Sequence, residues 1–233
     1  MLNLIRSDAF NLIDERTACV IIEPVQGEAG IIVPEKDFLN KLREHCDKSG
    51  ALLIFDEVQT AFGRLGAITA SEKYSVTPDI IVLGKALGGG LPLGAFVSST
   101  RIMNTLAFDP PLGHITTFGG HPLSCAAGMA SLDYLVREKL AESAENKGML
   151  FRKFLDHSLI SEIRGEGLML AVVPDRGISV PDLVTRAPAF GILIDYFLFC
   201  SDAFRIAPPL TISEQEIESA CNSIIKLLED SVK

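Results

Sequence analysis

The sequence predicts an α/β protein: a mostly parallel β-sheet with flanking helices, followed by a small α+β domain. Three observations support this. Apolar, β-branched runs alternate with helical patterns over the first half of the 233 residues, as in parallel strands joined by right-handed crossovers. The runs are nearly continuous, which is typical of strands covered on both faces. Past residue 137 the pattern changes to a helix, several short strands and a last helix. We therefore divide the chain into residues 1–137 and 138–233.

The first domain is expected to begin with a β-α-β-α-β series. Pro34 near the start and Gly50 at the end mark the longer of its two helices, because proline suits the first turn and glycine the left-handed cap. Phe38, Leu42 and Cys46 fall on one face of that helix. The expected elements are strands over residues 17–25, 51–58 and 77–87, with helices over 34–50 and 71–76.

The remaining elements complete the two predicted domains. A glycine-rich stretch over residues 88–94 returns to strand character and precedes a helix rich in small residues. The last helix opens with a capping box formed by Ser213 and Glu216. The expected elements are helices over residues 121–140, 141–158 and 213–230, with strands within 163–173, 191–197 and 203–209.

Composition and charge exclude several classes of protein. The chain is 48% hydrophobic and 22% charged, as in ordinary globular proteins. Its net charge of −9 disfavours nucleic-acid binding, which needs a basic face. No apolar run approaches the ~18 residues of a membrane span. Five scattered cysteines without a C-x-x-C pair suit reduced thiols. We expect a cytoplasmic protein that binds neither nucleic acid nor a membrane, and no metal site.

Ionisable residues end two of the predicted strands. Asp56 and Glu57 follow one apolar run, and Lys85 follows the next. Parallel strands end at the same edge of a sheet, where ligands of α/β proteins bind. Taken singly, a strand-end acid or lysine is about equally well explained as a solvated surface residue. Neither residue alone therefore identifies a binding site. Together, and followed by three glycines at 88–90, they favour a binding site.

Nucleotide binding is one interpretation of this edge. The stretch "LLIFDE" is typical of a magnesium-holding strand in P-loop NTPases, but the loop G-x-x-x-x-G-K-[ST] is absent. Gly84-Lys85 is followed by Ala86 and lies downstream of the acids. A dinucleotide loop starting at Gly88 would need glycine where Leu93 stands. The NTPase interpretation stays open as the less favoured alternative.

Pyridoxal-phosphate chemistry is the second interpretation. It needs a lysine to form a Schiff base with the cofactor aldehyde and an acid to hold a proton on the pyridine nitrogen. A lysine at the end of an apolar strand should be desolvated, which frees its amine. Lys85 and Asp56 fit these two roles.

Further residues suit a substrate and phosphate site, each with an ordinary structural alternative. Arg205 lies between apolar neighbours and could clamp a carboxylate or form a structural ion pair. Thr116 and Thr117, followed by two glycines, could cradle an anion or simply precede a helix cap. His121 is interpreted as a turn or packing residue.

Five motifs in order carry a family resemblance. They are "EPVQGEAGIIVP", "LLIFDEVQTAFGRLG", "PDIIVLGKALGGGLPLGAFV", "TTFGGHPLSCAA" and "FRIAPPL". Together they resemble the class III pyridoxal-phosphate-dependent aminotransferases, and their wording is nearest to the acetylornithine/ornithine branch. The resemblance implies a fold-type I transferase: part of the large, cofactor-binding domain in residues 1–137 and the small domain in 138–233. It covers nearly the whole chain.

The resemblance also implies roles at the cofactor. Lys85 would be the Schiff-base lysine and would move the proton from the substrate α-carbon. Asp56 would pair with the pyridinium nitrogen, with Val58 against the ring face and Gln59 at the ring hydroxyl. Thr117 would bind the cofactor phosphate of a partner subunit, which implies a homodimer. Glu57 would support these residues without a catalytic role.

At the substrate, Arg205 would take the α-carboxylate, and Glu28 would pair with Arg205 or release it. One site could then accept both an ω-amino donor and the acceptor 2-oxoglutarate. Ornithine or acetylornithine is the expected donor; 4-aminobutyrate, lysine and other ω-amines stay open, and a racemase or mutase is a more distant alternative.

Two departures from the family pattern bear on activity. His121 stands where the family has asparagine. Only 22 residues precede Glu23, and they contain no Gly/Ser/Thr loop for the cofactor phosphate and no stacking aromatic residue of the family's N-terminal part. We therefore expect a C-terminal portion with exposed apolar strand faces. Such a chain would bind the cofactor weakly, be an inactive remnant, or depend on a partner.

Overall fold

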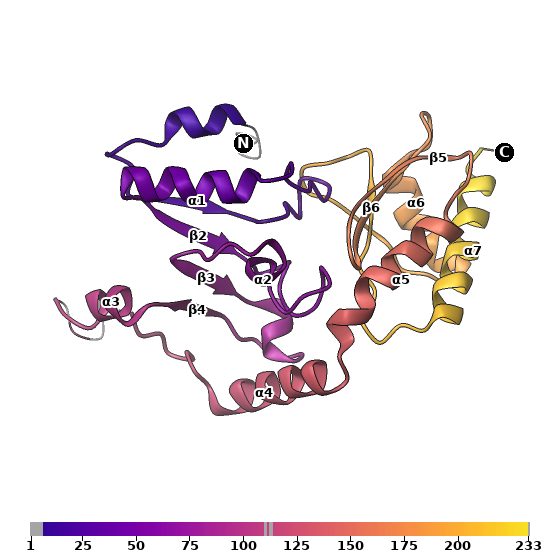
Figure 1. Cartoon of the computed structure of the whole chain (residues 1–233). Helices are drawn as coiled ribbons and strands as arrows, with labels where there is room; N and C mark the ends of the chain where they lie inside the picture. The colour runs from indigo at the N-terminus through magenta and orange to yellow at the C-terminus, as the bar shows by residue number, and fades with distance from the viewer. Residues whose placement is uncertain (1–6, 110, 112–113, 233) are drawn as a thin grey trace. The chain divides into compact units, whose positions relative to one another are not determined.

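The computed structural model describes residues 7–109, 111 and 114–232 and divides into two compact units (Figure 1). The assignment of residues 1–137 and 138–233 to two domains stays a prediction; residues 1–6, 110, 112–113 and 233 lie outside the described residues. Segments 25–33 and 63–68 belong to the second unit although they come early in the sequence. Unit 1 otherwise runs to residue 138 and unit 2 begins again at 139.

Unit 1 contains a four-stranded sheet in the order β1-β2-β3-β4. The first three strands pair in parallel, as the sequence predicts, and β4 is antiparallel to β3. The antiparallel edge strand was not anticipated. The strands are β1 (Cys19–Ile22), β2 (Leu52–Asp56), β3 (Ile80–Leu83) and β4 (Ala95–Ser98).

Helices connect and flank these strands. The predicted 34–50 helix is α1; it buries Phe38, Leu42 and Cys46 and ends at Gly50, whose φ is 78°. It begins four residues after Pro34, because Asp37 takes a left-handed conformation (φ 64°). The elements are η1 (Ser7–Leu12), α1 (Phe38–Ser49), α2 (Ala70–Tyr74), η2 (Lys85–Gly88), α3 (Thr100–Met103), η3 (Asn104–Leu106) and α4 (Pro122–Arg137).

The two faces of this sheet differ in burial. Successive residues of a strand face opposite sides, so Leu53 and Phe55 share one face and are fully buried. The other face carries Ile54 with its neighbour Ile21, which is 57% exposed. Phe96 of β4, on the same face through Val82 and Asp56, is 42% exposed. The edge strand β4 is exposed on both faces, however, because Val97, on the face of Phe55, is 55% exposed. The expectation of strands covered on both faces is therefore wrong for this face, whereas the expected apolar exposure is present.

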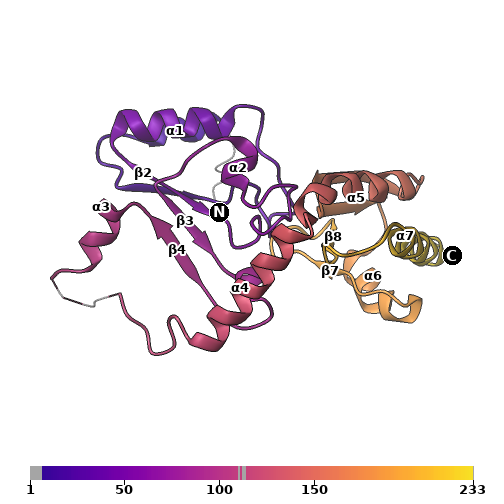
Figure 2. The same cartoon turned by 60° about the horizontal axis from the view of Figure 1, so that its bottom comes forward.

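Unit 2 is built around a four-stranded antiparallel sheet in the order β5-β6-β8-β7. Helices α5 and α7 pack side by side in both views (Figures 1 and 2). The elements are α5 (Leu140–Phe154), β5 (Ile160–Glu166), β6 (Met169–Pro174), α6 (Val180–Arg186), η4 (Ala187–Phe190), β7 (Asp195–Tyr196), β8 (Phe204–Ile206) and α7 (Glu214–Asp230).

A closed hydrophobic core joins the helices of unit 2 to its sheet. Phe151 of α5, Leu170 of β6, Phe204 of β8 and Ile217 of α7 are almost completely buried in one cluster. The predicted capping box of α7 is confirmed: the Ser213 side chain accepts from the Glu216 amide, and the Glu216 carboxylate accepts from the Ser213 amide. No helix among the described residues is long and apolar enough to cross a membrane.

Helix α6 was missed by the sequence analysis. Ser179 caps it by accepting from the Asp182 amide, and Pro181 lies in its first turn. Both are ordinary helix-start signals, but the helix has only seven residues and too short an apolar period to stand out.

Candidate active site

Two parallel strands of unit 1 bring the predicted cofactor residues to one sheet edge. Asp56, the last residue of β2, pairs in register with Val82 of β3. Strand β3 ends at Leu83, and Lys85 follows two residues later. The carboxyl ends of both strands therefore lie next to each other, at the edge where open α/β sheets bind ligands.

A tight turn after β2 places the side chains around Asp56. The Val58 amide donates to Asp56 Oδ1 at 3.1 Å, which orients the carboxylate. The Val58 side chain then lies against Gly84 of the neighbouring strand end: a Cβ added at Gly84 would lie 3.4 Å from Val58 Cγ1. Glycine at 84 thus leaves room for Val58 beside Asp56, while Gln59 is half-buried in the same turn.

Lys85 is exposed and has a left-handed backbone, with φ at 47°. The prediction that it would be desolvated is therefore wrong for this chain. Strand β3 ends at Leu83, before Lys85, which is instead the first residue of η2. A positive φ is uncommon in residues other than glycine and often accompanies a functional position.

One of the glycines after Lys85 serves helix packing. A Cβ at Gly89 would lie 2.5 Å from the Ala127 carbonyl oxygen of α4, and a Cβ at Gly128 would overlap the Leu87 carbonyl. Close approach of α4 to η2 therefore requires glycine on both sides. Gly90 has open space around it, and its φ of 98° is the feature that favours glycine there.

Glu57 is fully buried and binds the chain's own backbone. Its carboxylate accepts from the amides of Ala70 (2.5 Å) and Ser71 (2.9 Å) at the start of α2, and from the Thr60 hydroxyl (3.1 Å). Burial raises the pKa of Glu57 above its usual value, and these three hydrogen bonds oppose that shift. Glu57 is thus placed to fasten the loop after Asp56, in agreement with a supporting role.

The turn before α4 holds the remaining predicted cofactor residue. Thr117 is exposed there, together with Thr116. His121 is the N-cap of α4, with the Leu123 amide donating to its Nδ1 at 3.3 Å. The interpretation of His121 as a turn residue is confirmed. Among the described residues, no group of three or more His, Cys, Asp or Glu is arranged to hold a metal ion.

The predicted substrate residues meet in unit 2. Arg205 Nη2 lies 2.7 Å from Glu28 Oε1, and both side chains are mostly buried. The guanidinium carbon of Arg205 lies 4.7 Å from the centre of the Phe197 ring. Its Nε is buried without a hydrogen-bond partner among the described residues. The pair is therefore a partly desolvated, charge-assisted ion pair.

Glu28 is held by two amides of residues 198–199 and by Arg205 of β8. Its Oε2 accepts from the Leu198 amide at 3.2 Å, and its backbone carbonyl accepts from the Phe199 amide at 3.1 Å. Arg205 takes the other carboxylate oxygen. Arg205 also lines a cavity of 280 Å³ whose other walls are largely apolar, including Phe151, Ile194 and Pro208.

Two arginines of unit 2 were not singled out from the sequence. Arg64 donates to the carbonyls of Leu168 (3.2 Å) and Pro208 (2.5 Å), and burial lowers its pKa. Arg164 donates to the Gly30 carbonyl at 2.6 Å. Each is adjacent to a glycine in the sequence, Gly63 and Gly165. Arginine beside glycine is a weak signal of close backbone approach, and it would have been the only one available.

The sequence matches the family model of the class-III aminotransferases over residues 3–228. The chain belongs to the class-III aminotransferase family. This removes the P-loop and dinucleotide-binding interpretations of the Asp56 edge. The expected fold, part of a fold-type I transferase with a mostly parallel sheet, is confirmed by the solved aminotransferase structures that it resembles.

Two curated relatives of the chain are acetylornithine aminotransferases. The chain is 42% identical over 221 residues to the acetylornithine aminotransferase of Methanopyrus kandleri, covering 94% of this chain and 56% of that protein. The enzyme of the same name from Methanothermobacter thermautotrophicus is 39% identical over 223 residues, with 94% and 55% covered. The chain thus spans about half the length of the curated relatives it matches.

Among solved structures, an ornithine aminotransferase from Plasmodium yoelii has a TM-score of 0.86 and 32% identity, covering 97% of this chain and 61% of that one. The acetylornithine aminotransferase from Elizabethkingia anophelis has a TM-score of 0.86 and 35% identity, with 97% and 58% covered. Nearly the whole chain therefore has the fold of these aminotransferases.

Proposed function

We propose that this chain carries the lysine, the ring acid and the carboxylate-binding arginine of a pyridoxal-phosphate-dependent aminotransferase. The reaction exchanges an amino group between an ornithine-like, acetylornithine-like or other ω-amino donor and 2-oxoglutarate. The observation that carries the proposal is the placement of Asp56 and Lys85 at the ends of two neighbouring parallel strands. The names of the relatives support the donor class.

The residues at this edge fit pyridoxal 5'-phosphate. When bound, the cofactor supplies an aldehyde that condenses with amines and a ring that withdraws electrons from the substrate α-carbon. Asp56, oriented by the Val58 amide, would hold a proton at the ring nitrogen. Val58 would lie against the ring face and Gln59 at the ring hydroxyl. Lys85 would supply the amine that holds the aldehyde and would move the proton of the substrate α-carbon.

Thr117 is assigned to the phosphate of a cofactor bound in a second subunit. Its exposure in the turn before α4 leaves its hydroxyl accessible for this contact. The assignment makes the working form a homodimer. We further propose a cytoplasmic location, supported by the five cysteines, all of which are free thiols.

Arg205 and Glu28 provide the substrate side of the proposal. A guanidinium that is only partly desolvated and already pairs with one carboxylate suits a bidentate α-carboxylate in place of Glu28. Glu28 neutralises Arg205 when the bound donor presents its ω-amino end, and yields Arg205 when 2-oxoglutarate or glutamate binds. One pair of side chains then serves both substrates.

Covalent trapping tests the assignment of Lys85. The purified chain is incubated with excess pyridoxal phosphate, reduced with borohydride and mapped by mass spectrometry. We expect the cofactor on the peptide containing Lys85, its loss in Lys85→Ala, and its retention in Lys48→Ala, which removes an exposed lysine of α1. Labelling that is spread evenly over many surface lysines would contradict the proposal.

A second candidate is favoured by the exposed sheet face and by the exposure of Lys85. The chain on its own would then hold the cofactor weakly and depend on a partner for turnover. Titration with pyridoxal phosphate, followed by visible absorption, measures the dissociation constant. Weak binding supports this candidate, whereas tight stoichiometric binding that is lost in Lys85→Ala would defeat it.

A further inference from the structure

The loop that carries Glu28 is tightly closed and strained. An antiparallel bridge between Gln26 and Ile32 closes it, with both hydrogen bonds at 3.0 Å. The amides of Gly30 and Ile31 both donate to the Gly27 carbonyl, at 3.1 and 3.2 Å. Ile31 has a φ of 53°, which is rare for a β-branched residue. Such a conformation persists only where surrounding contacts impose it.

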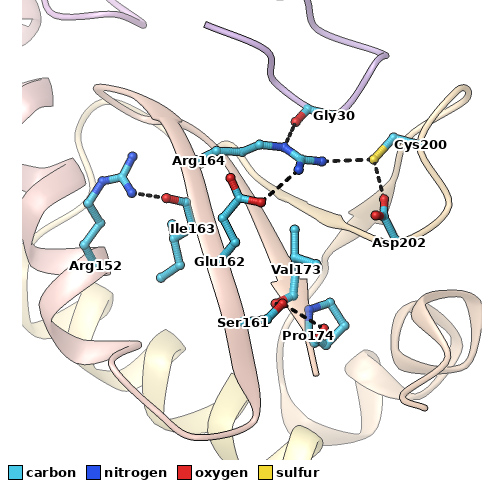
Figure 3. Close-up of polar contacts among 10 residues, drawn as sticks. All are labelled: Gly30, Arg152, Ser161, Glu162, Ile163, Arg164, Val173, Pro174, Cys200 and Asp202. Atoms are coloured by element: carbon cyan, nitrogen blue, oxygen red, sulfur yellow. Dashed lines mark hydrogen bonds and ion pairs between the residues drawn. The ribbon is translucent and has the colours of Figure 1, made fainter. Parts of the chain in front are cut away.

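Strand β5 supplies those contacts from two consecutive residues, Arg164 and Gly165. Arg164 Nε donates to the Gly30 carbonyl at 2.6 Å (Figure 3). A Cβ at Gly165 would lie 3.0 Å from Ile31 Cγ2, and Ile31 is completely buried. The Arg164 guanidinium therefore holds Gly30 through its carbonyl. Gly165, because it has no side chain, leaves room for Ile31 against β5.

The guanidinium of Arg164 is itself fixed by two further groups (Figure 3). Its Nη1 donates to Glu162 at 3.1 Å and its Nη2 to Cys200 Sγ at 3.2 Å. The Cys200 thiol donates to Asp202 at 2.9 Å. Burial, with Asp202, raises the pKa of this thiol, so it remains a donor. Gly30 packs directly on this group, since a Cβ there would lie 2.7 Å from Arg164 Nη2 and overlap the sulfur of Cys200.

The segment of residues 198–200, which contains Cys200, also binds Glu28. Leu198 and Phe199 donate to the Glu28 carboxylate and carbonyl, and Cys200 follows them directly in the sequence. Arg164 therefore ties the Glu28 loop to the segment of residues 198–200 at one end, and Glu28 ties it at the other. Because Glu28 lies two residues from Gly30, its carboxylate is placed by the contact that Arg164 makes.

We propose that Arg164 is a positioning residue that sets how strongly Glu28 competes with a substrate carboxylate for Arg205. The inference rests on the proposed function, in which Arg205 binds that carboxylate. A carboxylate held by a rigid loop loses little freedom when it pairs with Arg205, so it competes well. Loosening the loop favours the substrate carboxylate and disfavours ω-amino donors, which need Glu28 to neutralise Arg205.

Arg164→Lys tests this, with Arg186→Lys as the matched control. Lysine keeps the charge but cannot donate to the Gly30 carbonyl and Cys200 in the same geometry. Arg186 is similarly exposed, and it binds Asp182 and Asp230 and, within the described part of the chain, makes no contact with the Glu28 loop. We expect Arg164→Lys to speed hydrogen exchange of the Leu198 and Phe199 amides. Arg186→Lys should leave both rates unchanged; equal rates in the two variants would overturn the inference.

Carboxylate affinity gives the second readout. Calorimetry with glutarate measures binding at Arg205 without cofactor or turnover. We expect Arg164→Lys to bind glutarate about fivefold tighter than the wild type. This ratio of dissociation constants corresponds to the net free energy of about one hydrogen bond. In a Glu28→Gln background, Arg164→Lys should add nothing, because the competitor is already gone. An unchanged affinity in the wild-type background, or an equal gain in both backgrounds, would overturn the inference.

Two further variants separate the possible failures. If Arg205→Met leaves the affinity for glutarate unchanged, or no variant binds glutarate, the proposed function fails and the inference with it. If Glu28→Gln tightens binding but Arg164→Lys does not, only the inference fails. Gly30→Ala displaces the same loop by steric overlap and should act in the same direction. It replaces Arg164→Lys if that variant does not fold, and an unchanged affinity in Gly30→Ala then overturns the inference.

Discussion

The two units of this protein differ in how completely they are built. Unit 2 closes a hydrophobic core between its sheet and helices and joins Arg205 to Glu28 in a mostly buried ion pair. Unit 1 leaves one face of its sheet open, with Ile21 and Phe96 exposed, and its Lys85 is exposed at the sheet edge. The proposed substrate-binding pair is thus formed within one compact unit, whereas the proposed cofactor residues lie on an incompletely covered one.

This difference predicts which of the two units a bound ligand stabilises more. In unit 2 the Arg205 guanidinium already pairs with Glu28, so a carboxylate ligand must compete with Glu28 for it. In unit 1 a ligand at the Asp56 edge adds contacts without displacing a buried ion pair. Ligand binding to the native state stabilises it by mass action, so we expect unit 1 to gain more from its ligand.

The largest expected effect contrasts one phenylalanine in each unit. Phe204→Ala empties a fully buried position in unit 2 and should lower the free energy of unfolding by about 3–5 kcal/mol. Phe96→Ala on the open face of unit 1, where the side chain is 42% exposed, should cost about 1 kcal/mol or less. Urea unfolding followed by circular dichroism measures both. Equal costs would show that the open face is covered in solution, and they would contradict the difference between the two units.

The sequence was sufficient for the features that depend on local pattern. The parallel order of β1, β2 and β3 followed from apolar β-branched runs separated by a helix that ends at Gly50. The placement of Asp56 and Lys85 at one edge followed from that order. The capping box at Ser213 was visible because its two residues are only three apart.

Features that depend on contacts between distant segments were not predictable. Nothing local to residues 25–33 shows that they join unit 2, because their partners are Arg164 and Cys200, more than a hundred residues later. A buried arginine has the same appearance in sequence as an exposed one. The exposure of Lys85 also escaped prediction, since it depends on where β3 stops and on what covers the sheet edge.

Glu57 provides the next test, because it is the buried polar anchor of unit 1. Glu57→Ala leaves the amides of Ala70 and Ser71 without their acceptor. We expect a loss of about 1–3 kcal/mol in the free energy of unfolding, the usual cost of buried unsatisfied donors. Glu44→Ala on the exposed side of α1 is the control and should change little. A cost as small as that of Glu44→Ala would show that the loop after Asp56 is held by other contacts.

The pH dependence of stability sharpens the role of Glu57. Burial raises the pKa of this carboxyl above 4.5, so the folded state binds its proton more tightly than the unfolded state. Its contribution to stability is therefore present at low pH and falls as pH rises from about 4.5 through the raised folded pKa. The stability of the wild type minus that of Glu57→Gln should decline over this range. A difference that rises with pH would reverse the sign of the pKa shift.

The smallest expected effects compare the helix caps of the two units. Ser213→Ala removes one half of a reciprocal capping box on a 17-residue helix and should cost about 1 kcal/mol. Thr69 caps the five-residue α2 by accepting only from the Glu72 amide at 3.1 Å. Glu57 already supplies acceptors for the two preceding amides of α2, so Thr69→Ala should cost less than Ser213→Ala. Urea unfolding orders the two variants, and the opposite order would mean that α2 depends on its own cap and not on Glu57.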